Sequence, residues 1–313
     1  MGTIIIILTA MIEIALGLYS IKTKSTQKRT RSWVRISAFA VFVLFTLMSV
    51  IQWGFSWYPL AVLLLIGGIA GSVSLALNKE DKRSYKAIPV VLKAVTMWLL
   101  IVIAVIPALI FPQYRLPKTT GKYEVSTSVF TYTDNSRIET FDDKGENRKV
   151  TVEFWYPKEV KGQYPLVVFS HGAFGVRASN TSTFYELASN GYIVCSINHP
   201  YHSMYTIDAE GKFTMADQSF IQEVLDVNNG IYDEETSFKL DHKWLKVRVE
   251  DMNFALDTII ENTKIKASDV VYQLIDTDKI GLIGHSLGGA ASAQLARERK
   301  DIGAVVNLDG SLL

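Results

Sequence analysis

The first 111 residues are dominated by long apolar runs that are separated by short polar segments. Only two charged residues, Glu13 and Lys93, lie well inside these runs. Each run has about the 20 residues that a helix needs to cross a bilayer. The pattern therefore predicts a transmembrane region over residues 1–111, with helices at about 3–21, 34–52, 59–77 and 88–111.

The charges between the runs predict how this region is oriented. Lysine and arginine gather in the segments 22–35 and 79–86, whereas the aromatic segment 52–59 has neither. The positive-inside rule places the two cationic segments in the cytoplasm. The last helix leaves from one of them, so we expect the chain after Phe111 to be extracytoplasmic. Because the helices carry few polar groups, an anchor in the cell membrane is favoured over a transporter.

The pattern changes after the proline-bearing segment 112–117, where we place the boundary of a second domain, 112–313. Short apolar runs of the buried-strand type, at 165–170 and 192–197, enclose a helical stretch at 183–190. That alternation predicts an α/β fold with a parallel sheet. Three strands are expected ahead of it, at 125–133, 137–141 and 148–156. Residues 200–240 show no clear period, and helix spacing returns at 245–262.

One stretch of this domain carries a catalytic pattern, Gly284-His-Ser-Leu-Gly288. An apolar strand precedes it, and a helix rich in small residues follows from Ser286 to Lys300. This is the nucleophile-elbow pattern, in which a strained turn lifts the serine hydroxyl above the edge of the sheet. The alternative is a glycine-rich helix start with an ordinary serine. An earlier strand that ends in Ser170-His-Gly172 and a later one that ends at Asp309 favour the elbow.

Composition narrows the classes of function and partner that remain. The formal charge is +1, from 32 basic and 31 acidic residues, so no nucleic-acid partner is expected. The single cysteine, Cys195, excludes disulfides within the chain. It lies in an apolar run and is interpreted as a buried hydrophobe rather than a catalytic thiol. No histidine has an acidic partner at metal-ligand spacing, so neither a metal nor another cofactor is expected. The sequence carries no signal of oligomeric state.

Several motifs of the second domain resemble one family. They are Leu116-Pro-Lys-Thr-Thr-Gly-Lys-Tyr123, Val152-Glu-Phe-Trp-Tyr-Pro157, Phe169-Ser-His-Gly172, Gly284-His-Ser-Leu-Gly-Gly289 and Leu308-Asp309. Together they resemble the platelet-activating factor acetylhydrolases (lipoprotein-associated phospholipase A2) and their bacterial relatives, within the α/β-hydrolase superfamily. The resemblance implies an α/β-hydrolase sheet and a serine esterase or lipase.

The expected catalytic residues follow from the elbow and from this resemblance. Ser286 is the expected nucleophile, and the backbone N–H groups of Ala173 and Leu287 are the expected oxyanion donors. The resemblance implies that Asp309, 23 residues after Ser286, is the orienting acid. The alternative for Asp309 is a structural aspartate that ends a strand. His171 and Phe174 of the oxyanion turn are possible pocket residues, as are His199 and His202.

The family's base is a histidine well beyond the acid, whereas this sequence ends at Leu313. The expectation is that the intact product continues for about 50 to 150 residues, as a complete domain would, and supplies the histidine there. The 313-residue form should then lack the base, have a sheet that is incomplete at its C-terminus, and be weakly active. His199 and His202 are the alternatives as substitute bases.

The sequence thus favours a membrane-anchored serine carboxylic-ester hydrolase. The resemblance implies short or oxidised acyl chains of phospholipids, or similar small esters, as substrates. The rival from another class is a catalytically inactive, hydrolase-like membrane protein that binds a lipid or a partner, and the missing base favours it.

Overall fold

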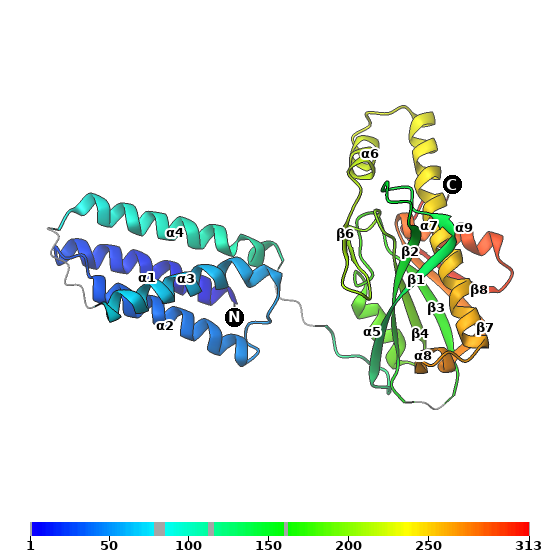
Figure 1. Ribbon diagram of the computed structural model, residues 1–313, viewed down its shortest axis with the longest axis horizontal. Helices are drawn as coiled ribbons and strands as arrows, with labels where there is room; N and C mark the ends of the chain where they lie inside the picture. Colours follow the sequence, from blue (N-terminus) through cyan, green and yellow to red (C-terminus); the bar gives the residue numbers. More distant parts are fainter. Residues whose placement is uncertain (1, 78–84, 112–115, 160–161, 313) are drawn as a thin grey trace. The chain divides into compact units, whose positions relative to one another are not determined.

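The computed structural model describes residues 2–77, 85–111, 116–159 and 162–312. The chain divides into two compact units, Met1–Arg115 and Leu116–Leu313 (Figure 1). Most of the cationic segment 79–86 and the predicted boundary at 112 lie outside the described residues.

The secondary structure of the first unit, where it is described, is helical. Its helices are α1 (Gly2–Lys22), α2 (Lys28–Leu47), the short 3-10 helix η1 (Phe55–Trp57), α3 (Tyr58–Ala76) and α4 (Ala87–Ile110). Among the described residues, three helical segments are long and apolar enough to cross a membrane: Lys28–Leu47, Phe55–Ala76 and Ala87–Ile110.

Apolar side chains lie on both the inside and the outside of this unit. Phe42, Trp57 and Leu60 are buried with Ile101 and Val105 of α4. Many other apolar side chains of these helices are exposed on the outside of the unit. Exposed apolar surface on this scale is typical of helices that lie in a lipid environment.

Glu13 is the acidic residue within the first apolar run. Its side chain is 7% exposed, and its Oε2 lies 3.9 Å from Nη1 of Arg31 on α2. An ionised group inside an apolar segment is costly unless it faces other helices or is paired. Arg31 supplies a counter-charge, whereas Oε2 of Glu13 accepts no hydrogen bond among the described residues.

The second unit is an α/β structure. Its strands are β1 (Val125–Ile138), β2 (Asn147–Pro157), β3 (Tyr164–Ser170), β4 (Ile193–Asn198), β5 (Tyr205–Ile207), β6 (Phe213–Met215), β7 (Ile275–His285) and β8 (Ile302–Leu308). Its helices are α5 (Thr181–Ser189), α6 (Gln218–Asn228), α7 (Glu234–Lys264), α8 (Val270–Leu274) and α9 (Leu287–Glu298).

The main sheet has the order β1-β2-β4-β3-β7-β8. β1 and β2 are antiparallel, as are β2 and β4, whereas β4, β3, β7 and β8 are parallel neighbours. This mixed, mainly parallel sheet with helices on both faces confirms the predicted α/β-hydrolase class.

Alternate residues of the central strands face opposite layers. Val168 of β3 packs in the large core with Met252 of α7 and Leu295 of α9. Its neighbours Val167 and Phe169 face the other side, in a smaller core that includes Phe184 of α5. Helices α7 and α9 therefore cover one face of the sheet and α5 the other, as Figure 1 shows. This is the two-residue period of a strand buried on both sides.

The predicted separate strand at 137–141 is wrong. β1 continues through Asp134-Asn-Ser136 to Ile138, with a register irregularity between Asp134 and Ile138. The backbone N–H of Ser136 donates to Oδ1 of Asp134 at 2.9 Å, a local bond that bends the strand. Pairing with β2 then resumes at Asn147, so a pattern that suggested a turn is a bulge.

Candidate active site

The turn between β7 and α9 has the geometry of a nucleophile elbow. Ser286 has φ 52° and ψ −126°, a conformation that non-glycine residues rarely adopt. A Cβ at Gly284 would lie 2.0 Å from the carbonyl oxygen of Gly288. One at Gly288 would lie 2.1 Å from the carbonyl oxygen of Ser170. Only glycine allows this approach of β7, α9 and β3, and the partly exposed Ser286 sits where they meet.

The turn after β3, residues 171–175, lies beside Ser286. A Cβ built on Gly172 would be 3.2 Å from Cβ of Ser286. Within the part of the chain that the structure describes, the backbone N–H groups of Ala173 and Leu287 donate to no acceptor. Leu287 is the first residue of α9, where N–H groups have no partner within the helix. Two unpaired donors thus lie on the two segments that meet at the serine, where an oxyanion would need them.

Asp309 follows β8 at the same edge of the sheet. In the pairing of β7 with β8, His285 lies opposite Leu308, and the N–H of Ser286 donates to the carbonyl of Leu308 at 2.8 Å. Asn307 and Gly310 exchange two hydrogen bonds that close the turn after β8. The carboxylate of Asp309 is exposed and accepts no hydrogen bond within the described chain. Parallel pairing thus brings Ser286 and Asp309 to neighbouring strand ends.

Three of the predicted pocket residues lie in a network that we call the buried polar cluster. Its members are Glu139, Arg148, Ser170, His171, His199, His202, Ser203, Arg248 and Asp251, each 9% exposed or less. The residues come from β2, from the ends of β3 and β4, from α7, and from the segment after β1. The cluster therefore joins the strand ends near the elbow to helix α7.

His199 stands in the middle of a hydrogen-bonded chain. Its Nδ1 lies 3.0 Å from Oδ2 of Asp251, and its Nε2 lies 3.0 Å from Oγ of Ser170. A carboxylate accepts only, so Nδ1 carries the proton and Nε2 accepts from the Ser170 hydroxyl. The order serine, histidine, aspartate is that of a catalytic triad. All three residues are 0% exposed, however, so no substrate reaches Ser170.

Arg148 balances the charge of Asp251. Its Nε and Nη2 donate to the two carboxylate oxygens of Asp251 at 2.7 Å each, and its Nη1 donates to Glu139 at 2.8 Å. Burial alone would raise the pKa of Asp251, but the charge and hydrogen bonds of Arg148 hold that pKa well below its usual range. Asp251 is therefore ionised at neutral pH.

The histidines of the cluster are neutral at physiological pH. Burial, assisted by the charge of Arg248, lowers the pKa of His199 to about 4 and that of His202 to about 2. The same two causes lower the pKa of His171 well below its usual value. Burial also lowers the pKa of Arg248, to about 9, which leaves its guanidinium charged at pH 7.

No hydrogen bond joins Ser286 to any histidine in the described part of the chain, and its Oγ has no partner there. His171, His199 and His202 are engaged within the buried polar cluster. His285 precedes Ser286 and is exposed. Ser286, the oxyanion turn and the end of β8 are thus brought together, whereas His199 and His202 point elsewhere.

Sequence reasoning missed Arg148, Arg248 and Asp251. Charged residues are usually assigned to the surface, because burying them unpaired is costly. One signal was present in α7. Arg248 and Asp251 lie three and six residues after Leu245, on the same helical stripe as the buried Met252 and Ala255.

An apolar wall adjoins the two segments that carry the expected oxyanion donors. Phe220 and Val224 of α6 and Trp244 of α7 form a small core. Ala173, Phe174 and Leu287 pack against it. Side chains next to both proposed N–H donors therefore belong to an apolar surface, which suits the hydrocarbon part of an ester.

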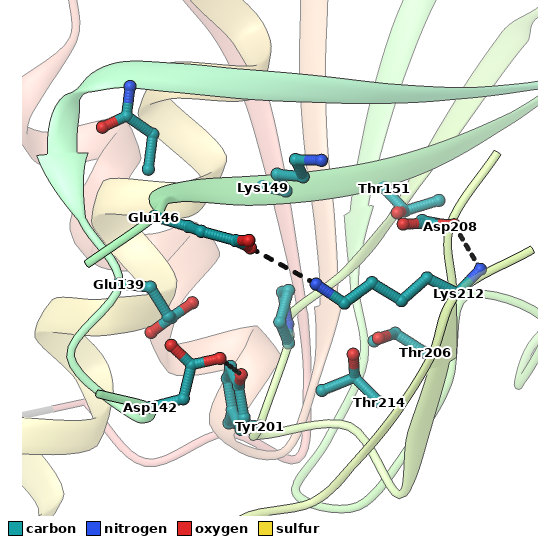
Figure 2. A pocket seen from close by; sticks show the side chains of 12 residues that line it. Glu139, Asp142, Glu146, Lys149, Thr151, Tyr201, Thr206, Asp208, Lys212 and Thr214 are labelled. Carbon is teal, nitrogen blue, oxygen red and sulfur yellow. Dashed lines mark hydrogen bonds and ion pairs between the residues drawn. The ribbon is translucent and has the colours of Figure 1, made fainter. Parts of the chain in front are cut away.

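A separate small hollow lies between the β1–β2 turn region and the β5–β6 hairpin (Figure 2). It encloses about 50 Å³, and Lys212 extends across it to Glu146 at 3.4 Å. Tyr201 donates to Asp142 at 2.9 Å on the opposite side. None of the elbow residues lines it. Within the described residues, no group of three histidine, cysteine or acidic side chains is placed to hold a metal.

Comparison with known proteins identifies a family for the second unit. A family model described as platelet-activating factor acetylhydrolase, isoform II, matches residues 146–313. The motif 116–123, on which the resemblance partly rested, lies outside this match.

Similar proteins include two platelet-activating factor acetylhydrolases. The one from Bos taurus is 29% identical over 162 residues, which are 47% of this chain and 35% of that protein. The one from Canis lupus familiaris is 29% identical over 176 residues, 50% and 37% of the two chains. Cutinase 2 of Thermobifida cellulosilytica is 26% identical over 154 residues, 49% and 42% of the two chains. The chain thus spans well under half the length of these relatives.

Among solved structures, a ferulic acid esterase from Streptomyces cinnamoneus aligns with a TM-score of 0.49 at 22% identity, over 62% of each chain.

Proposed function

The chain belongs to the platelet-activating factor acetylhydrolase, isoform II family, and on this premise we propose that it is a membrane-anchored serine esterase. Its proposed substrates are carboxylic esters with short acyl chains, including those of phospholipids. The observation that carries the proposal is the strained Ser286, flanked by the unpaired N–H groups of Ala173 and Leu287.

The proposed reaction is acyl transfer in two steps. The Ser286 hydroxyl attacks the ester carbonyl, its proton passes to a base, and negative charge develops on the carbonyl oxygen. The N–H groups of Ala173 and Leu287 would stabilise that charge, and each such donor typically contributes about 3 kcal/mol to lowering the barrier. The alcohol leaves with a proton, and water then releases the acid and restores Ser286. Asp309 would orient the base.

We assign the base to no histidine of the buried polar cluster. Each of the three is already hydrogen-bonded within the cluster and is at most 1% exposed. A general base must come within about 3 Å of the proton that it removes, directly or through one water.

Labelling with a fluorophosphonate probe tests the proposal on the longest natural form of the protein. We expect covalent labelling that Ser286→Ala abolishes. Ser292→Ala is the matched control, because Ser292 lies on the same helix but is 0% exposed and donates to the carbonyl of Gly288. Failure to label, or equal labelling of Ser286→Ala, would exclude Ser286 as the nucleophile.

The second candidate is a hydrolase-like protein that binds a lipid or a partner without turnover. The absence of a histidine hydrogen-bonded to Ser286 in the described chain favours it. Hydrolysis of p-nitrophenyl acetate and butyrate decides between the two. Turnover that depends on Ser286 supports the esterase, whereas ligand binding without turnover supports the binding protein.

The proposed location is the cell membrane, with 1–111 as a multipass anchor and 112–313 as an extracytoplasmic hydrolase domain. Three apolar helices and the cationic segments at 22–35 and 79–86 support this arrangement. Protease added to intact cells or spheroplasts should cut after Phe111 and spare the segment around Arg29. The opposite pattern would invert the topology.

A further inference from the structure

Arg248 makes an unusual set of contacts for a fully buried arginine. Within the described residues, no carboxylate lies within ion-pairing distance of its guanidinium. Its donors point instead at carbonyl oxygens of two loops. Nη1 donates to the carbonyl of His171 at 2.8 Å, and Nη2 lies 3.3 Å from the carbonyls of Gly172 and of His202.

These contacts link the oxyanion turn to helix α7. The turn has bonds of its own, since the N–H of Gly175 and Nδ1 of His171 also reach the carbonyl of Gly172, at 3.1 and 2.7 Å. Such local bonds set the shape of the turn. Bonds from outside set its position: the N–H of Phe174 donates to the carbonyl of His202 at 3.3 Å, the N–H of Met204 donates to the carbonyl of Gly175 at 3.4 Å, and Arg248 donates to the carbonyls of His171 and Gly172. Of these three groups, Arg248 is the one that bonds to the Gly172 carbonyl.

The direction of the Ala173 N–H follows from the position of the Gly172 carbonyl. The two groups belong to one trans peptide unit, in which C=O and N–H point in opposite directions. Holding the carbonyl toward Arg248 therefore aims the N–H of Ala173 away from α7. A Cβ built on Gly172 would lie 3.2 Å from Cβ of Ser286, so this peptide lies beside Ser286.

We propose that Arg248 is a positioning residue that holds the Ala173 N–H in place to stabilise the oxyanion. This inference rests on the proposed esterase function. Among the described residues, no hydrogen bond joins Arg248 to Ser286, and its Nη1 and Nη2 reach the site through the carbonyls of the turn. The guanidinium also ties the turn to the loop of His202, which keeps both loops in one arrangement.

The test compares an oxygen ester with its thionoester, in which sulfur replaces the carbonyl oxygen. Sulfur accepts hydrogen bonds weakly, so well-placed N–H donors accelerate the oxygen ester much more. Arg248→Lys keeps the charge but loses the planar fork that reaches several carbonyls at once. We expect Arg248→Lys to lower kcat for the oxygen ester by about 10- to 100-fold with little change in KM, and to lower the oxygen-to-sulfur rate ratio by about tenfold.

The ratio is measured on one preparation with both substrates, so it does not depend on how much of the protein is folded. Arg148→Lys is the matched control. Arg148 belongs to the same buried polar cluster, but it bonds to Asp251, Glu139 and the carbonyl of Pro200 and to no carbonyl of the oxyanion turn. The Arg148→Lys variant should reduce the amount of folded protein and leave the oxygen-to-sulfur rate ratio at the wild-type value.

Two further variants keep the test decisive. Arg248→Gln removes the charge, and its shorter side chain loses most of the ability to reach the carbonyls of the turn. Ser203→Ala removes the hydroxyl that lies 2.8 Å from Nε2 of His171, and should shift the ratio in the same direction by less. An unchanged ratio in the active variants would overturn the role of Arg248. Persistent turnover in Ser286→Ala would instead overturn the esterase assignment, so the two failures are distinct.

Discussion

Asp251→Asn is the substitution that most directly tests whether the buried polar cluster holds the hydrolase unit together. The change keeps the size of the side chain but removes its charge and replaces one acceptor oxygen with a donor NH₂ group. In the native protein, the oxygens of Asp251 accept two bonds from Arg148 at 2.7 Å each and one from His199 at 3.0 Å. Nη2 of Arg137 lies 3.0 Å from the same carboxylate.

The expected cost is that of leaving a buried charge without its partner, about 3 to 5 kcal/mol. Arg148, whose side chain is 5% exposed, would keep only Glu139 as a counter-charge. For a domain of this length, 1 kcal/mol corresponds to about 2 to 4 °C in Tm, so Tm should fall by about 6 to 20 °C.

The single cysteine provides the assay. Cys195 is 0% exposed in the central strand β4, so its thiol becomes reactive only when the hydrolase unit opens. Heating the detergent-solubilised full chain with a maleimide that fluoresces on reaction reports the unfolding of this unit alone, because the chain has no other cysteine.

Glu250→Gln is the matched control, one residue earlier on α7. Its side chain is 42% exposed and pairs with Arg137 at 3.5 Å and Lys246 at 3.9 Å. Exposed pairs contribute less than about 1 kcal/mol, so Tm should stay within about 3 °C of the wild type. A Tm of Asp251→Asn that also stays within that range would refute the view that this carboxylate anchors the cluster.

Three further predictions concern the effect of pH, the glycines of β7 and the buried cysteine. The histidines of the buried polar cluster have folded pKa values below the 6.5 of an unfolded chain, so stability is full above about pH 6.5 and falls as the pH drops toward 4. Each histidine should cost about 1.4 kcal/mol per pH unit, and a Tm that is constant from pH 7 to 4.5 would contradict this. Gly284→Ala should abolish both folding and fluorophosphonate labelling, because its Cβ would lie 2.0 Å from a carbonyl oxygen, whereas Gly281→Ala, whose Cβ would lie 3.6 Å from its neighbour, should retain both. Burial raises the pKa of the Cys195 thiol, so iodoacetamide should leave the native protein unmodified and react after denaturation; stoichiometric reaction with the native protein would show that β4 is accessible.

The sequence by itself determined the features that depend on neighbouring residues. The apolar runs at 165–170 and 192–197 became β3 and β4, because a short, continuously apolar run suits a strand that is covered on both faces. The elbow could also be predicted, since strand, turn and helix are consecutive and Gly284 is required by a contact four residues away, with the carbonyl of Gly288. The need for glycine at 288 comes instead from the carbonyl of Ser170 on β3, a long-range contact. The bulge at Asp134 was misread as a turn because the same short polar residues favour both.

Only the tertiary structure decided where the polar residues of distant segments lie. Arg148 on β2, His199 after β4 and Asp251 on α7 are brought together by the pairing of β2 with β4 and by the packing of α7 on the sheet. Nothing local distinguishes these charges from surface charges, because their burial is favourable only once all the partners are in place. The same reasoning applies to Arg248, whose role depends on carbonyls 76 and 77 positions away in the chain. Short-range patterns thus determined the elbow and the strands, while long-range packing decided which charges are buried and what holds the oxyanion turn.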